Sequence, residues 1–323
     1  MASQRPATIP TGADSRLRGL TGGRLGVALL LALLCPSEPA AAQAASPAPP
    51  PYSLPWLLRP AVPGSVLRLD ESLAFLEEPA TGQGGATYVT SLIVTYRLTP
   101  RWVPIFRETY IHDDPPASGA PSADAFSNPL LGVNYFHPLG GGWRWTGFLA
   151  STVPVGSGGG DDPDTAKANA QTAAMRARSA MDNALFSVNY WTVIGGLGLA
   201  RITRGLTLQA EVTVFQLTRV RGPETQDGSR TNLTAGLHAG HFFSPKVSLG
   251  AEIRLQNWLS DAAPVRSDPS ARQQLTLGLG PRLHFKLAEG RLLRPGLSYT
   301  RAFDDPMKRS GYDVVQIDVP FAF

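Results

Sequence analysis

The side chains best placed to do chemistry are charged residues that recur at every second position near the C-terminus. The basic members are Arg254, Arg282, Lys286 and Arg294, with His284 beside them and with Glu252 and Asp318 as acidic members. Alternate residues of an extended chain face the same side, so these side chains are expected to share one face. Cations on such a face attract anions, and the carboxylates cancel part of that field. The spacing predicts either an anion-favouring wall or a self-neutralising network, and both interpretations stay open.

Other chemistry has little support. His238 and His241 are three residues apart, so in a strand they face opposite sides and do not share a metal ion. The stretch 161–164 has acidic residues but lacks the spacing of a calcium-binding EF-hand loop. The chain also has no Gly-x-Ser-x-Gly motif of a nucleophilic serine. We predict no catalytic residue, no metal site and no cofactor.

The elements that must position the charged residues are long strands. Between Val247 and Leu255 apolar residues alternate with polar or small ones, and the same period of two runs from Gln274 to Leu287. This pattern predicts about twelve strands, most of them near the ~9–11 residues of a tilted spanning strand. Their predicted ranges are 66–76, 86–98, 102–112, 127–137, 143–155, 186–202, 206–219, 231–243, 247–259, 273–287, 291–303 and 313–323.

The connections between these strands alternate in length. Short turns are expected at 99–101, 138–142, 203–205, 244–246 and 288–290, whereas the intervening links are longer and rich in Asp, Gly, Pro and Ser. Bacterial barrels show this asymmetry between periplasmic turns and external loops. The fold class is therefore predicted to be all-β, a transmembrane antiparallel up-and-down β-barrel over residues 66–323.

The longest predicted external loop contains an alanine-rich stretch. Alanine favours helix, and Asp164 is a suitable N-cap, so a short helix is expected after it. The stretch 165–183 could cap the barrel, fold inward as a constriction or stay exposed as a lid.

The N-terminus resembles an export signal. Arginines precede the apolar run Leu25 to Leu34, and Ala40 to Ala42 offers a small-residue cleavage site, which predicts a signal peptide over 1–42. A lipoprotein signal ending at Cys35 is the alternative, although Leu34 is larger than the residue such signals carry there. Residues 43–65 are rich in proline and are expected to form an extended periplasmic leader.

Composition agrees with an exported barrel. Hydrophobic residues make up 43% of the chain and charged residues 17%, and no apolar run approaches the ~20 residues of a spanning helix. The net charge of +4 is scattered, without the basic clusters of a nucleic-acid-binding protein. Nucleic acid is therefore not an expected partner.

The C-terminus completes the prediction of an outer-membrane location. Its last strand presents Phe321 and the terminal Phe323 on its apolar face, which resembles the signal recognised by the outer-membrane assembly machinery. That machinery, outer-membrane lipids and a small-molecule solute are the expected partners. Loss of Phe323 is expected to lower membrane insertion without affecting secretion.

Two short stretches carry a family resemblance. Residues 127–135, and then 153–156 opening a Gly- and Asp-rich loop, resemble outer-membrane barrels of the transporter type associated with phenol meta-pathway degradation. The resemblance implies passive transport of small, often hydrophobic molecules and supplies no individual site residue. A passive channel for a small anionic or hydrophobic solute is the first functional hypothesis. The alternative is a closed structural or interaction barrel that displays external loops and whose lumen is plugged by side chains.

Overall fold

The computed structural model describes residues 51–78, 81–116 and 120–323. The predicted signal peptide over 1–42 and the first part of the predicted leader, 43–50, lie outside these residues. Among the described residues, no helix is long and apolar enough to cross a membrane.

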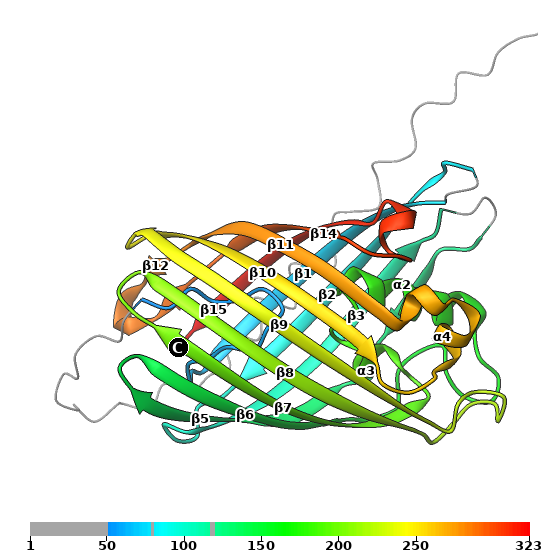
Figure 1. Ribbon diagram of the computed structural model, residues 1–323, viewed down its shortest axis with the longest axis horizontal. Coiled ribbons are helices and arrows are strands. Elements are labelled where there is room, and N and C mark those ends of the chain that lie inside the picture. The colour runs from blue at the N-terminus through cyan, green and yellow to red at the C-terminus, as the bar shows by residue number, and fades with distance from the viewer. Residues whose placement is uncertain (1–50, 79–80, 117–119) are drawn as a thin grey trace, which may run out of the picture. The chain divides into compact units, whose positions relative to one another are not determined.

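Strands dominate the described residues, as the period of two predicts. Twelve of them form the wall of a closed antiparallel barrel (Figure 1). They are β1 (Val66–Glu77), β2 (Gly84–Thr95), β3 (Trp102–Asp114), β5 (Leu130–Gly140), β6 (Trp143–Thr152), β7 (Tyr190–Ile202), β8 (Leu206–Arg219), β9 (Ser229–Ser244), β10 (Val247–Trp258), β11 (Gln273–Leu283), β14 (Gly296–Ala302) and β15 (Asp313–Ala322). Each pairs with its neighbours in chain order, which confirms the predicted fold class and up-and-down topology.

The first and last strands close the barrel. β1 pairs with β15 in a continuous register that runs from Val66 opposite Ala322 to Phe75 opposite Asp313. Closure leaves neither strand with an unpaired edge, which satisfies its backbone groups without help from water. Beyond the register, the amide of Phe323 donates to the carbonyl of Ser65 at 3.1 Å, so the terminal phenylalanine is tied to the start of β1.

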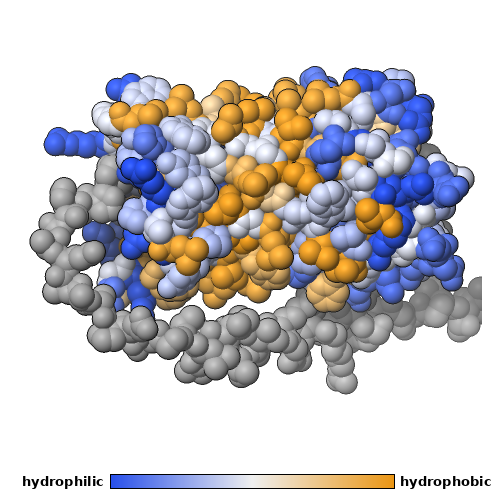
Figure 2. Space-filling model, turned by 90° about the horizontal axis from the view of Figure 1, so that it is seen from below, coloured by the Kyte–Doolittle hydropathy of each residue, from blue (hydrophilic) through white to orange (hydrophobic). Residues whose placement is uncertain are grey.

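The two faces of the wall differ as the alternation predicts. On β10, Leu249 and Ile253 are exposed on the outer face, whereas Glu252 and Arg254 are buried on the inner face. Figure 2 shows the outer surface as an apolar band between two hydrophilic ends. An outward apolar belt around a polar interior is the arrangement of a membrane barrel, the inverse of a soluble one.

The long loops and all described α-helices lie at one end of the barrel (Figure 1). The helices are α2 (Thr165–Ala177), α3 (Asn183–Phe186) and α4 (Ala263–Ser267), and the short 3-10 turns η1 (Pro269–Arg272) and η3 (Lys308–Ser310) follow in the later loops. The predicted helix is confirmed: α2 begins after Asp164, whose side chain accepts a hydrogen bond from the amide of Lys167 at 3.1 Å.

Two predicted strands are interrupted in the structure. The predicted strand 273–287 breaks at His284, between β11 and β12 (Phe285–Lys286), and the predicted strand 291–303 breaks at 294–295, between β13 (Leu292–Leu293) and β14. β12 and β13 continue the register of β11 and β14, and η2 (Ala288–Gly290) forms the predicted turn between them. Pro295 has no N–H to continue the ladder at this point. A short strand that was not predicted, β4 (Ala123–Phe126), pairs with β3.

Candidate functional site in the barrel lumen

Glu252 and Arg254 come together on the inner face of β10. The Arg254 Nε donates to Glu252 Oε2 at 3.0 Å, and its Nη1 donates to Thr300 Oγ1 on β14 at 3.1 Å. Both side chains are buried. A buried ion pair with further hydrogen bonds has little free charge to offer a solute.

Arg282 and Asp318 form a second buried pair on β11 and β15. The guanidinium donates two hydrogen bonds to the carboxylate, at 2.8 and 3.0 Å. Asp318 also forms an ion pair with Arg68 of β1, in which Nη2 and Oδ2 are 2.8 Å apart. One carboxylate therefore lies between two guanidiniums, in the fork geometry that arginine favours.

The other predicted residues of this face are less tightly paired. His284 is buried and its Nε2 lies 2.8 Å from Ser248 Oγ. Arg294 is partly buried, and its carbonyl accepts a hydrogen bond from Arg282 at 2.8 Å. Lys286 is exposed on β12, next to the turn that joins β12 to β13. The four basic residues are thus not one unopposed wall, since two of them are neutralised by ion pairs.

Sequence reasoning missed the N-terminal segment, residues 52–62, which lies inside the lumen. Trp56 and Leu58 are almost fully buried. The Arg282 guanidinium stacks on the Trp56 ring, with its Cζ 4.2 Å from the ring centroid. Glu252 accepts hydrogen bonds from the amides of Trp56 and Leu57, the second at 3.1 Å. This part of the predicted leader therefore binds the same charged residues that the sequence singled out.

A second group of wall residues holds the two ends of the N-terminal segment. The amide of Arg59 donates to Glu211 Oε2 on β8 at 3.0 Å, and the Arg59 guanidinium lies 3.2 Å from the same carboxylate. The Tyr52 hydroxyl donates to Gln209 at 3.1 Å and accepts from the amide of Ala61 at 2.8 Å, which folds the segment back on itself.

Glycines on the inner face make room for this segment. A Cβ at Gly196 would lie 2.8 Å from Arg59 Nη2, and one at Gly236 would lie 2.7 Å from Leu58 Cδ1. At Gly296 it would lie 2.5 Å from the Trp56 ring, and at Gly240 it would overlap Ser53. Because glycine alone allows such close approach, these four positions form a track for the N-terminal segment. The paired Gly195 and Gly196 cause no bulge, since the register of β7 is continuous there.

The alanine-rich loop also folds inward, from the opposite end. We call residues 165–189 the inward loop. In α2, Ala170 and Ala174 are fully buried, and their small side chains let the helix approach the wall closely. Gln171 Nε2 donates to the carbonyl of Phe126 at 2.8 Å, and the carbonyl of Ala173 accepts from the Tyr312 hydroxyl at 2.9 Å. Of the three predicted arrangements, these contacts agree with the one in which the stretch folds inward.

Ion pairs anchor the inward loop after α2 ends. Arg178 is almost fully buried and donates to both oxygens of Asp70 on β1, at 2.9 and 3.2 Å. Its Nε also donates to Asp182 at 3.1 Å, and Arg107 of β3 lies 2.9 Å from that carboxylate. Burial by itself would raise the pKa of Asp182, but the two guanidiniums outweigh it and lower the pKa to about 2.

His238 and His241 lie on opposite faces of β9. His238 is buried with its Nε2 3.1 Å from the carbonyl of Ser53, and His241 is exposed on the outer face. Among the described residues, no group of three His, Cys, Asp or Glu side chains is arranged to hold a metal ion.

Comparisons with known proteins give structural matches only. The chain matches no family model and no curated protein sequence. It is similar to an outer membrane channel from Pseudomonas putida F1, with 11% identity and a TM-score of 0.51 over 83% of this chain and 98% of that one. It is also similar to the NanC porin, with 10% identity and a TM-score of 0.48 over 79% and 98% of the two chains. For the KdgM porin in complex with disordered oligogalacturonate, the identity is 8% and the TM-score 0.45 over 80% and 99%.

At this level of identity the channel from Pseudomonas putida shows a shared fold. That fold agrees with the closed twelve-stranded barrel and its outward apolar belt. Barrels of this kind span membranes because every backbone group of the wall is paired and no edge is open. The protein is therefore an outer-membrane β-barrel.

Proposed function

We propose that the protein is a passive outer-membrane channel for a small solute, constricted by its own N-terminal segment and inward loop. The observation that carries this proposal is that two segments of chain, and not the side chains of the wall alone, fill the lumen. The obstructions are two segments of chain, whereas the wall beneath the N-terminal segment has glycines at 196, 236, 240 and 296 among its polar side chains. Glycines leave the wall thin at these four points, so moving the N-terminal segment would leave a passage.

The contacts of the N-terminal segment suit a removable constriction. The amides of Leu57 and Arg59 donate to the wall carboxylates Glu252 and Glu211. Water in an open lumen would satisfy both partners of such bonds, and each contributes about 1.5–3 kcal/mol net because its acceptor is charged. The segment can therefore leave without disrupting any strand of the wall.

Small anions are the solute class that we favour. The buried charged side chains in the described residues are Arg68, Arg107, Arg178, Arg254 and Arg282 against Asp70, Asp113, Glu252 and Asp318. The partly buried Arg59, Asp182 and Glu211 belong to the same network, so the paired charges of the lumen balance. Arg294 has no carboxylate partner among the described residues and adds one positive charge, which favours anions weakly. A hydrophobic solute, as the resemblance to meta-pathway transporters implies, is the second class.

The alternative function is a closed barrel that displays its external loops. The pairing of nearly all of these buried charges supports it, because such a network stiffens the interior. The two functions differ in whether the lumen conducts after its N-terminal segment is removed.

Conductance across planar bilayers tests the proposal. Two variants of the mature protein are compared with the wild type: one lacks residues 51–62, and the other carries Gly and Ser at 52–59 in a segment of unchanged length. Both should conduct more than the wild type, on the order of threefold, because the segment occupies much of a narrow lumen. If neither variant conducts, the closed barrel replaces the channel. If both conduct like the wild type, the N-terminal segment is not the constriction.

A further inference from the structure

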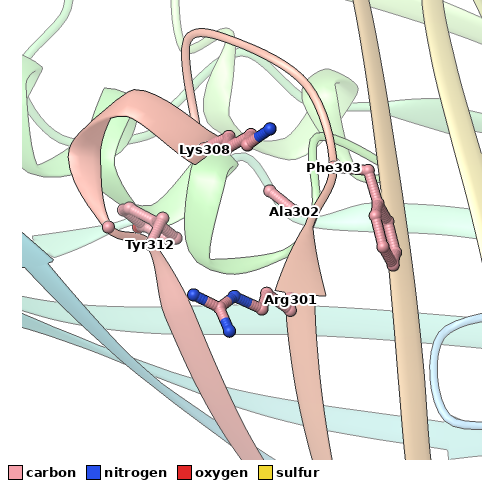
Figure 3. A pocket seen from close by; sticks show the side chains of 6 residues that line it. Arg301, Ala302, Phe303, Lys308 and Tyr312 are labelled. Atoms are coloured by element: carbon pink, nitrogen blue, oxygen red, sulfur yellow. The ribbon is translucent and has the colours of Figure 1, made fainter.

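A cavity lies at the external rim of the barrel, where β14 ends and the loop to β15 begins. Its volume is about 280 Å³, and its lining consists of Arg301, Ala302, Phe303, Lys308, Gly311 and Tyr312. Figure 3 shows Arg301 below the loop and Lys308 on the loop itself, with Phe303 beside the neighbouring strand. The left-handed conformation of Gly311, with φ of 56°, turns the chain from η3 back to the wall and closes one side of the cavity.

The position along β14 places this cavity at the membrane surface. Leu297 and Tyr299 are exposed on the outer face, and Arg301 follows them with the same parity. Aromatic residues mark the interfaces of a membrane barrel. Two residues of a strand span roughly 6.6 Å, so Arg301 lies one step beyond Tyr299, at the level of the lipid headgroups.

The cations at this cavity are less well paired than others in the external loops. Arg266 and Arg272 lie 2.7 and 2.9 Å from the carboxylates of Asp227 and Asp261. In contrast, Lys308 forms no ion pair with any described residue, and Arg301 Nε is 3.7 Å from Asp313 Oδ1 while its side chain stays 69% exposed. The residues that line the cavity include these two cations and no carboxylate, so the cavity itself is positively charged.

We infer that this cavity binds a phosphate group on the headgroup of an outer-leaflet glycolipid. A guanidinium binds phosphate oxygens through two parallel hydrogen bonds, and an ammonium group adds a point charge from the second side. Phe303, with 53% of its surface exposed, and Tyr299 offer apolar contact to the acyl chains below the phosphate. The site acts on lipid outside the wall, so it does not depend on whether the lumen conducts.

Binding of lipid A, a doubly phosphorylated glycolipid, to the full mature protein in detergent tests this inference. Native mass spectrometry measures how much lipid A the protein retains in the wild type and in the double variant Arg301→Gln, Lys308→Gln. Loss of both charge-assisted contacts should weaken retention about tenfold. The matched control is Arg201→Gln, Arg204→Gln, which removes two exposed cations at the opposite end of the barrel. This control should retain lipid A like the wild type.

Further measurements distinguish lipid phosphate from free inorganic phosphate, and loss of the site from misfolding of the variant. Lipid A without its phosphates should bind the wild type weakly. Its retention should match that of doubly phosphorylated lipid A by the double variant. Arg301→Lys, Lys308→Arg keeps the charges and should restore most of the retention. Equal retention by the double variant and its control would overturn the site. If millimolar inorganic phosphate displaces lipid A completely, the cavity holds free phosphate and the lipid assignment is wrong.

Discussion

The N-terminal segment and the inward loop enter the same lumen, but the wall holds them by different chemistry. The N-terminal segment has no helix or strand, donates backbone amides to Glu252 and Glu211 over a glycine track, and adds one ion pair, from Arg59 to Glu211. The inward loop packs a small-residue helix and inserts the buried guanidinium of Arg178 between Asp70 and Asp182. The loop is also joined to the wall at both ends, by β6 and β7, whereas the N-terminal segment is joined only to β1.

This difference indicates separate roles for the two constrictions. A buried ion pair is costly to break because the remaining charge stays in a low-dielectric site. The N-terminal segment is held by neutral amides and by the partly exposed Arg59, and these groups can exchange their carboxylate partners for water at lower cost. Under the channel proposal, the inward loop is therefore the fixed narrowing of the external half, and the N-terminal segment is the part expected to move.

The largest expected effect is on the anchor of the inward loop. Arg178→Ala leaves Asp70 buried with one guanidinium fewer, so the free energy of unfolding should fall by about 3 kcal/mol. Urea unfolding of the refolded barrel, followed by tryptophan fluorescence, measures it. Lys167→Ala, which breaks an exposed pair with Asp164 on the same loop, should cost less than about 0.5 kcal/mol. Equal losses would show that the loop is not anchored by Arg178.

The second effect is the pH dependence of the same anchor. Asp182 has a pKa of about 2, below the value of 3.8 that it has when unpaired. Because the folded pKa is depressed, the carboxylate stabilises the fold fully above pH 3.8, and this contribution is lost as the pH falls from about 4 to 2. The loss should be about 2 kcal/mol in the wild type, by the shift in pKa.

Asp182→Asn separates this carboxylate from the other acids. The variant should be less stable than the wild type at neutral pH, and the difference should shrink as the pH falls toward 2. Urea midpoints at pH 7 and at pH 3 measure both quantities. A constant difference between the two proteins would contradict the role given to Asp182.

The sequence predicted the wall better than its contents. Alternation along Val247 to Leu255 is a local property, so it gives both the strands and the inward face on which Glu252 and Arg254 lie. The interruptions at His284 and at 294–295 were missed because the alternating pattern runs through them, and pairing resumes in the same register with Phe285 opposite Leu293. Sequence alternation does not report a local break in backbone pairing.

The N-terminal segment could not be predicted in the same way. A proline-rich stretch has no period, and its partners Glu211 and Glu252 lie 152 to 196 residues away in the chain. The glycines at inward positions could have predicted a segment inside the lumen. In a strand, a glycine at such a position often marks the close approach of another backbone. The sequence also places basic residues on one face without showing that Asp318 pairs with Arg282.

The third prediction tests the glycine track by comparing substitutions at two adjacent residues, Gly196 and Gly195. Gly196→Val should push Arg59 away and loosen the N-terminal segment, because a Cβ there would also lie 2.9 Å from Thr213 Oγ1. Amide hydrogen exchange at Leu57 and Arg59 should become about tenfold faster, which corresponds to about 1.4 kcal/mol. Gly195→Val is the control, since a Cβ at Gly195 meets no atom within 4 Å. Equal acceleration in both variants would mean that β7 itself has loosened.

The smallest expected effect is on ion selectivity, and it compares the paired Arg282 with the exposed Lys286 of the predicted basic wall. Reversal potentials are measured on the protein lacking residues 51–62, in which the lumen is open under the channel proposal. Arg282→Gln leaves Asp318 with one guanidinium instead of two, so the preference for chloride over potassium should fall by roughly twofold. Lys286→Gln should change it less, because Lys286 is exposed next to the turn between β12 and β13 and salt screens its charge. Equal shifts would mean that both cations act on one pathway, as a continuous basic wall requires.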